Sequence, residues 1–293
     1  LPISTINTGT AGGTVSFGGA IEGNTAGAPF NDLLVITSGT GDVTFSGAIG
    51  ATNALGGLSV NASSGDGNIT FSSTIGDTSN PGVVGTTSIG NTDTADLNFN
   101  AATYSFDGGT TTITAASGDT IDMGALAATS FTTAADNITF ATGTIELLNG
   151  SNLTVDTGAT GGDITIASIA GTSVETVTLD AGTGALSVGA IGSGTEIGAV
   201  TLGSTDDGTV TLNGAIKTDG NVTITGPVSL ATGAISVTTT NDNITFNDTI
   251  NGTRALTLVA GTGTTTIQGE IGGSSALASL TITNGTANGA IEI

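Results

Sequence analysis

Residues 261–285 read GTGTTTIQGEIGGSSALASLTITNG, and residues 182–204 read GTGALSVGAIGSGTEIGAVTLGS. Both segments run through Gly-Thr-Gly, a short apolar strand, Gly-x-Ile-Gly, small polar residues, and then a strand in which Thr lies between apolar residues. Self-similarity at a fixed spacing is the sequence signature of repeat architectures. The repeated phrase therefore indicates a chain that builds one structural unit many times.

The same strand pattern recurs along the chain at a drifting interval. It reads GDVTFSGAIG at 41–50, GNITFSSTIG at 67–76 and SLTITNG at 279–285. Val177 and Val200 occupy equivalent positions in successive repeats. The interval is longer towards the N-terminus, where the equivalent positions are those of Phe17, Phe45, Phe71 and Phe99. A period of roughly 22–28 residues fits the coils of a solenoid, whereas the blades of a propeller need roughly 40–50.

The phase of these strands predicts which side chains form the core. Successive residues of a β-strand face opposite sides, so in a V-T-F or L-T-V strand the two apolar residues share one face and the Thr takes the other. The pairs expected to point inward are Val43 and Phe45, Ile69 and Phe71, Leu153 and Val155, and Leu256 and Leu258. The residues expected to point outward are Thr44, Thr70, Thr154 and Thr257.

These observations predict an all-β fold, a right-handed parallel β-helix of roughly 12 coils with roughly 22–28 residues per coil. Gly, Asn, Asp and Ser between the strands suit corners with positive φ. Like residues then stack on like about 4.8 Å apart, and the four Phe residues of the first third form an internal aromatic stack. We expect one continuous β-helix over residues 1–293, with irregular or enlarged coils around 78–135, because no Pro-rich or charged linker interrupts the pattern.

The charge balance excludes several partners. The chain has 24 Asp and Glu residues against Lys217 and Arg254 alone, a net charge of −22. A nucleic-acid binder needs a basic footprint, and an anionic membrane surface would repel this chain for the same reason. No stretch approaches the roughly 18 consecutive apolar residues of a membrane span, so no membrane insertion is expected. The absence of Cys excludes disulfides and thiolate metal sites.

The sequence also argues against an enzyme. Ser-His-Asp and Cys-His catalysis are excluded because the chain has neither His nor Cys. Glycoside hydrolysis requires two carboxylates across a groove, usually beside aromatic residues that stack on sugar. The carboxylate pairs Asp119 with Asp122 and Asp206 with Asp207 have no Trp, Tyr or basic partner near them in the sequence. We therefore expect no catalytic residues and no organic cofactor.

The acidic residues suggest one cofactor, Ca²⁺. Asp residues recur in the turn just before a strand, at Asp42, Asp66, Asp163, Asp207, Asp219 and Asp242. Carboxylates stacked in successive coils repel one another unless they are spaced, protonated or bridged by a cation such as Ca²⁺. Asp is also a favoured turn residue in its own right, and no EF-hand loop or calcium-binding nonapeptide occurs. The turn role is the favoured interpretation, and bound Ca²⁺ at these six residues is the alternative.

The segments GTGALSVGAIG, GGDITIASIAG and GTGTTTIQGEIGGSSALASLTITNG resemble the strand repeats of giant bacterial surface proteins. These include filamentous-haemagglutinin-type exoproteins and proteins with autotransporter-associated β-strand repeats. The resemblance is one of repeat style and covers the chain from about Gly12 onward. It implies export to the extracellular space or cell surface, a parallel β-helical stalk, and an adhesive or matrix role.

The two ends of the sequence add an expectation about assembly. The chain starts without Met and stops at GAIEI, inside its own strand pattern. We expect a processed product or a piece of a longer protein, with each end covered by more of the same chain or by identical subunits stacked head to tail. The predicted function is a structural, non-enzymatic extracellular fibre or adhesin stalk that self-associates end to end. The alternative is a solenoid that binds glycan or ice through outward ladders of Thr and Asn.

Overall fold

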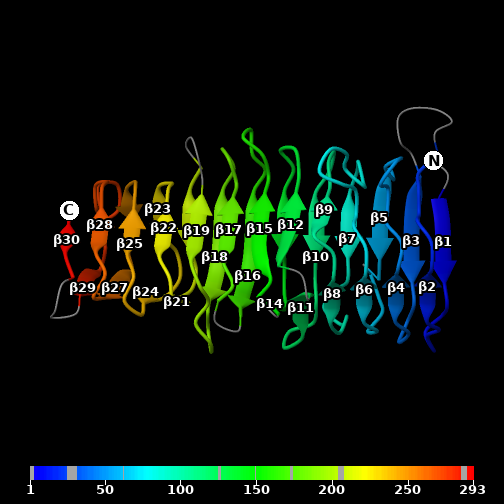
Figure 1. The fold of residues 1–293 in the computed structure, drawn as a ribbon, viewed down its shortest axis with the longest axis horizontal. Helices are drawn as coiled ribbons and strands as arrows, with labels where there is room; N and C mark the ends of the chain where they lie inside the picture. Colours follow the sequence, from blue (N-terminus) through cyan, green and yellow to red (C-terminus); the bar gives the residue numbers. More distant parts are fainter. Residues whose placement is uncertain are drawn as a thin grey trace. The chain divides into compact units, whose positions relative to one another are not determined.

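The structure is a computed structural model, and its regular secondary structure consists of β-strands alone within the residues it describes (Figure 1). The described residues are 3–24, 32–61, 63–124, 127–148, 150–171, 174–203, 208–284 and 289–293. Over these ranges, no helix is long and apolar enough to cross a membrane. The chain divides into two compact units, Leu1–Ser151 and Asn152–Ile293, which are described in turn.

Unit 1 consists of parallel strands arranged in three ladders. Ladder 1A contains β1 (Ile3–Asn7), β3 (Leu33–Thr37), β5 (Gly57–Val60), β7 (Thr87–Ile89), β10 (Thr111–Ile113) and β13 (Ile138–Phe140). Ladder 1B contains β2 (Val15–Phe17), β4 (Val43–Phe45), β6 (Ile69–Phe71), β8 (Leu97–Phe99), β11 (Thr120–Met123) and β14 (Thr144–Leu147). Ladder 1C begins as single bridges that join Ile21, Ile49, Ile75 and Tyr104, and continues as β9 (Thr103–Ser105) and β12 (Ala128–Thr132).

Unit 2 repeats this arrangement. Ladder 2A contains β16 (Ile164–Ala170), β18 (Leu186–Ile191), β20 (Val210–Leu212), β23 (Val228–Leu230) and β26 (Ile250–Asn251). Ladder 2B runs from the C-terminal ends of β16 and β18 through β21 (Ile216–Thr218), β24 (Ile235–Thr239), β27 (Ala255–Gly261) and β29 (Ser279–Asn284). Ladder 2C contains β15 (Asn152–Asp156), β17 (Val177–Asp180), β19 (Val200–Gly203), β22 (Val222–Ile224), β25 (Ile244–Phe246), β28 (Thr265–Ile267) and β30 (Ile291–Glu292).

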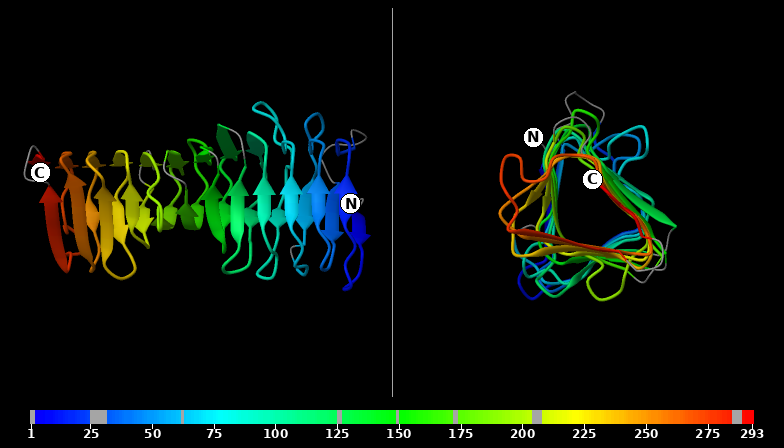
Figure 2. Two further views of the ribbon diagram at one scale, coloured as in Figure 1. Left: turned by 60° about the horizontal axis from the view of Figure 1, so that its bottom comes forward. Right: turned by 90° about the vertical axis from the view of Figure 1, so that its left-hand side faces the viewer.

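Within each unit the three ladders form the sides around a central core (Figure 2). The two units contain about 11 turns in all, so the predicted right-handed parallel β-helix is confirmed, with slightly fewer coils than expected. The region 78–135 contributes β7 to β12, which take part in the ladders in the same way as their neighbours. The prediction of one continuous helix over residues 1–293 stays a prediction.

The coils vary in length more than the sequence repeats predicted. In unit 2, Val210 pairs with Val228 across a coil shorter than the predicted interval. In unit 1, Ile3 pairs with Leu33 across a coil longer than that interval. The predicted range of coil lengths was too narrow on both its short and its long side. The ladders align only the strands, and the turns between them absorb insertions and deletions without a change of register.

The predicted division into inward and outward side chains is confirmed. All eight residues expected to point inward are at most 1% exposed: Val43, Phe45, Ile69 and Phe71 in unit 1, and Leu153, Val155, Leu256 and Leu258 in unit 2. The intervening Thr residues are only partly buried. The predicted aromatic stack is also present, with ring centroids 5.1, 4.8 and 5.2 Å apart between successive Phe residues. Tyr104 lies edge-on to the last of these rings, 4.9 Å away.

Candidate functional site

The Asp and Asn residues that precede strands bond one coil to the next. In unit 1, Asp42 Oδ1 accepts a hydrogen bond from the Asn68 N–H (3.0 Å), and Asn68 Oδ1 accepts one from the Asp96 N–H (3.2 Å). Asp96 Oδ1 in turn accepts one from the Thr120 N–H (3.0 Å). Unit 2 has equivalent bonds, in which the N–H groups of Thr176, Ala185, Asn243 and Thr264 donate to Oδ1 of Asn152, Asp163, Asn221 and Asn243, respectively. We call these coil-to-coil Asx bonds; they satisfy N–H groups at the corners, where the strand ladders begin.

The structure describes five of the six calcium candidates. Asp42 and Asp163 each direct an oxygen at a backbone N–H, and Asp66 and Asp219 are exposed. The backbone N–H of Asp242 donates to Thr239 Oγ1 (3.2 Å). The remaining candidate, Asp207, lies outside the described residues. No group of three or more Asp, Glu, His or Cys residues able to hold a metal ion occurs within the described ranges, and calcium binding stays a prediction.

A groove of about 420 Å³ crosses the corner of unit 1 between ladders 1A and 1B. Turns from four successive coils line it, at residues 7–10, 37–40, 64–66 and Asp93. Each of the first three turns contains a Gly with positive φ, such as Gly39 at 59°. A Cβ on Gly39 would overlap the carbonyl oxygen of Gly9 in the coil before it. Gly is therefore required at position 39 for its turn to stack closely on the coil before it, and the lack of side chains at these glycines helps to keep the groove open.

A buried set of polar side chains supports the floor of this groove. The polar brace consists of Ser38, Asn61, Asn91 and Thr94, of which all but Asn91 are fully buried. The Ser38 N–H donates to Asn61 Oδ1 (2.8 Å), and Asn61 Nδ2 donates to Ser38 Oγ (2.9 Å). Asn91 Nδ2 and Thr94 Oγ1 both donate to the carbonyl oxygen of Gly65, at 3.0 and 3.1 Å. The brace therefore ties together three of the turns that form the groove.

Asn61 holds its place in the brace with an unusual backbone conformation. Its φ is 49°, in the left-handed region that Asn tolerates better than most residues other than Gly. Its side chain is completely buried and hydrogen-bonded on both its oxygen and its nitrogen. A buried polar network of this kind rigidifies its surroundings when its members are satisfied.

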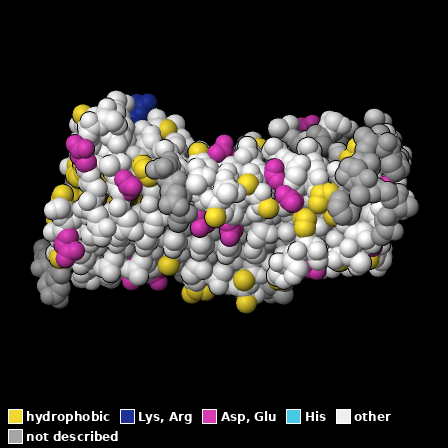
Figure 3. Space-filling model, turned by 90° about the horizontal axis from the view of Figure 1, so that it is seen from above, with side chains coloured by type: hydrophobic (Ala, Val, Ile, Leu, Met, Phe, Trp, Pro, Cys, Tyr) yellow, Lys and Arg dark blue, Asp and Glu magenta, His cyan; other side chains and the backbone are white. Residues whose placement is uncertain are grey.

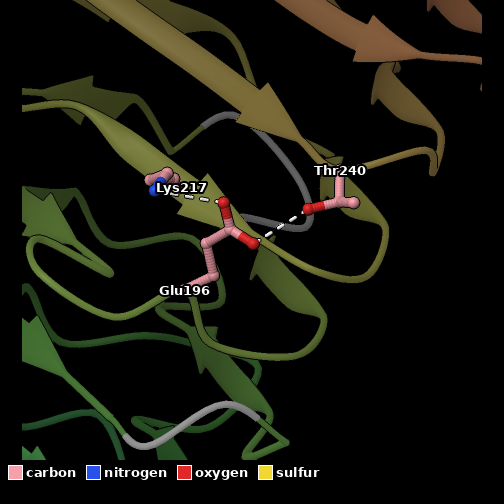
Figure 4. Close-up of polar contacts among 3 residues, drawn as sticks. All are labelled: Glu196, Lys217 and Thr240. Atoms are coloured by element: carbon pink, nitrogen blue, oxygen red, sulfur yellow. Dashed lines mark hydrogen bonds and ion pairs between the residues drawn. The ribbon is translucent and has the colours of Figure 1, made fainter.

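Three side chains from successive coils meet on the surface of unit 2 (Figure 4). Lys217 Nζ lies 3.1 Å from Glu196 Oε1, and Thr240 Oγ1 donates a hydrogen bond to Glu196 Oε2 (2.8 Å). The hydrogen bond from Thr240, together with the nearby ammonium of Lys217, lowers the pKa of Glu196. Because the ion pair is solvent-exposed, this cluster contributes little to stability.

Asp122 in unit 1 is an acidic residue in an unfavourable place. It points outward from β11, between Asn98 of β8 and Glu146 of β14. Its Oδ1 atom is buried and has no hydrogen-bond partner within the described residues. Burial raises the pKa of Asp122, and the carboxylate of Asp96 adds to the rise. In the sequence, Asp122 stands out only as half of a carboxylate pair with Asp119, and in the fold it occupies this unfavourable setting.

Ladder 2C carries a regular file of threonines. Six consecutive strands place Thr154, Thr178, Thr201, Thr223, Thr245 and Thr266 at the same register position. All six side chains point outward, and successive members are about 4.8 Å apart. On the face drawn in Figure 3, acidic side chains lie scattered rather than gathered in one large patch. The Thr file is therefore an ordered array of hydroxyl and methyl groups.

Comparison of the chain with protein-family models, with curated proteins and with solved structures gives no match. The resemblance to filamentous-haemagglutinin-type repeats therefore stays a prediction. The candidate sites rest on the geometry of the described residues.

Sequence reasoning found the outward Thr residues but missed the groove and the polar brace. A signal for the groove is present, because successive turns read TGTAGG at 8–13, SGTGD at 38–42 and SSGDG at 63–67. Small residues that recur at one corner indicate a surface without protruding side chains. The brace has no such signal, since Asn is common throughout this chain and only the fold reveals that Asn61 is buried.

Proposed function

We propose that the chain is a structural, non-enzymatic segment of an extracellular fibre or adhesin stalk, in which β-helical coils stack end to end. The observation that carries this proposal is the unpaired edge of unit 2. Strand β29 pairs with β27, and β30 pairs with β28; within the described residues, neither has a partner on its other side. An open row of backbone N–H and C=O groups is a template for pairing with another strand.

The side chains at this edge support the same proposal. Leu256 and Leu258 of β27 are fully buried, whereas Leu280 and Ile282, which pair with them in β29, are only half-buried. Ile291 of β30 is 50% exposed. One more coil would cover these apolar groups, with a gain of about 25 cal/mol for each Å² removed from water.

An edge of unit 1, formed by β2, has the same character. Phe17 stacks on Phe45 and is only half-buried, whereas Phe45 lies between two rings and is 1% exposed. Pairing of this edge with β29 and β30 of another copy is a heterologous contact, and such contacts propagate into fibres when they do not close into a ring. The extracellular location follows from the repeat-style resemblance.

Electron microscopy and sedimentation velocity over a concentration series test the proposal. We expect the chain to form thin filaments whose length grows with concentration. Ile282→Lys, which puts a charge on the inward side of β29, should abolish them. The matched control is Thr283→Lys, which adds the same charge to the outward side of that strand and should leave the filaments intact. A wild-type chain that stays at 27.9 kDa at every concentration would refute end-to-end stacking.

The Thr file favours a second function, the binding of ice. A rigid array of hydroxyl and methyl groups, repeated about every 4.8 Å, presents a lattice on which water can order. Thermal hysteresis of a solution of the chain measures this activity. Thr223→Lys, in the middle of the file, should abolish the hysteresis. Thr211→Lys on ladder 2A should preserve it, and a wild-type chain without hysteresis would exclude this function.

A further inference from the structure

We infer that the groove of unit 1 binds a short saccharide that is neutral or carries an amine. This inference does not depend on end-to-end stacking, because the groove lies at a corner within unit 1. Its volume of about 420 Å³ falls in the range of roughly 300–1,000 Å³ that is typical of small-molecule sites.

The lining of the groove matches the chemistry of sugar hydroxyls. Thr10 and Ser64 supply hydroxyl groups that both donate and accept. The Thr40 hydroxyl already donates to the carbonyl oxygen of Ala11 and supplies an acceptor, and the Asn7 amide, whose oxygen accepts from the Gly9 N–H, supplies its NH₂ donors. Asp66 and Asp93 supply carboxylate oxygens, which make charge-assisted hydrogen bonds to hydroxyl or amine donors. The Thr methyl groups add apolar surface for the C–H groups of a sugar ring.

The charge of the groove excludes anionic ligands. Unit 1 contains neither Lys nor Arg, because Lys217 and Arg254 both belong to unit 2. A phosphate, sulfate or carboxylate group would therefore meet two carboxylates without any neutralising cation. A polyamine would satisfy the carboxylates but would leave the hydroxyl and amide groups of the other turns unused. The mixture of donors and acceptors favours a polyhydroxylated ligand.

The polar brace prepares the groove for such a ligand. Saccharides bind through many modest hydrogen bonds, so affinity depends on how little ordering the site requires on binding. Behind the groove, Asn61 and Ser38 bond to each other, and Asn91 and Thr94 hold the carbonyl oxygen of Gly65. Turns 37–40 and 64–66 are also joined directly, because the Asp66 N–H donates to the carbonyl oxygen of Gly39 (3.0 Å). They are thus held relative to each other before any ligand arrives.

Saturation-transfer NMR and calorimetric titration of the full chain test the inference, with cellobiose, N,N′-diacetylchitobiose and glucosamine as probes. Spermidine serves as the polyamine probe and 3′-sialyllactose as the anionic one. We expect at least one of the three saccharide probes to bind, and sialyllactose to show no binding. Binding of spermidine alone would overturn the inference in favour of a polyamine site, and binding of none of the probes would overturn it outright.

Two Trp substitutions locate the binding. Ser64→Trp fills the groove from an exposed position and should weaken saccharide binding by about tenfold or more, a loss of about 1.4 kcal/mol. Ser72→Trp is the matched control, because Ser72 is exposed just after β6, at the corner between ladders 1B and 1C, and does not line the groove. Both positions are on the surface, and circular dichroism verifies that both variants fold. Equal affinity of the two variants for the saccharide would overturn the assignment to this groove.

Discussion

Replacement of Phe71 by Leu tests whether the aromatic stack of unit 1 stabilises the fold beyond simple burial. Phe71 is fully buried and lies between Phe45 and Phe99, with ring centroids 4.8 and 5.2 Å away and ring planes within 9° of parallel. Leu keeps most of the apolar volume but removes both stacked contacts. Phe71→Leu should therefore lose the ring–ring contribution while it retains much of the contribution from burial.

The magnitude follows from the two ring pairs. Stacked aromatic pairs contribute about 0.5–1.5 kcal/mol each beyond the burial of their surface, so two pairs give about 1–3 kcal/mol. The exchange of one large apolar residue for another costs about 1 kcal/mol in addition. We expect Phe71→Leu to lower the free energy of unfolding by about 2–4 kcal/mol in total.

Phe246→Leu in unit 2 is the matched control. Phe246 is also fully buried, but its neighbours in ladder 2C are Ile224 and Ile267, and it contacts no other ring within the described residues. Phe246→Leu should lower the free energy of unfolding only by the cost of exchanging one large apolar residue for another, about 1 kcal/mol. The difference between the two variants isolates the aromatic stack from the effect of side-chain size.

Guanidinium unfolding with two probes provides the assay. The chain has a single Tyr and no Trp, so the fluorescence of Tyr104, which lies against Phe99, reports on unit 1 alone. Far-UV circular dichroism follows the strands of both units and is the probe for Phe246→Leu. If Phe71→Leu costs no more than Phe246→Leu, the stacked rings act only through their buried area and the reasoning fails.

Three further predictions concern the polar groups. Asn61→Gly removes the side chain that bonds to Ser38 and should lower the free energy of unfolding by about 1–3 kcal/mol in denaturant titrations. Asn61→Ala should lower it by about 1–2 kcal/mol more, because Ala tolerates the positive φ poorly. Equal losses for the two variants would contradict the role given to the positive φ. Asp122→Asn should raise the free energy of unfolding at pH 7 by on the order of 0.5 kcal/mol, because the pKa of Asp122 is raised in the folded state and its ionised form is disfavoured there. This gain should shrink as the pH falls through the raised pKa, since the folded protein then takes up the proton; a gain that is constant down to pH 4 would refute the assignment. Calcium chloride and a chelator should give the same melting temperature, because the carboxylates of Asp42 and Asp163 already accept backbone hydrogen bonds; a rise of several degrees with calcium would show that the acidic turns bind the ion.

The fold could be predicted from the sequence because its main determinant is periodic. The alternation in segments such as 41–50 sets which residues face inward, and a one-residue slip would expose Val43 and Phe45 while burying Thr44. The repeat interval then places equivalent strands in adjacent coils. The short coil that ends at Val228 and the long coil that ends at Leu33 escaped prediction because turn length does not alter strand register.

The candidate sites were less predictable because they depend on neighbours that are distant in sequence. Asp93 lines the same groove as Asn7, although they belong to different coils, because the turns of successive coils stack along one corner. Asp122 was visible as an acidic residue, but its unfavourable setting depends on burial and on Asp96, which lies one coil earlier. Properties of single strands could be read from the sequence, whereas contacts between side chains of different coils required the fold.

The coil-to-coil Asx bonds separate the surface charge of this protein from its fold. In unit 1, the file of Asp42, Asn68 and Asp96 alternates a charged carboxylate with a neutral amide, and each makes the same bond through Oδ1. Exchange of Asp for Asn at such a corner removes one negative charge and keeps an oxygen acceptor in the same place. The isoelectric point can therefore drift during evolution, or be set by design, across many coils while the hydrogen bonds that join the coils persist. A net charge of −22 is in this sense a quantity that selection can adjust independently of the architecture.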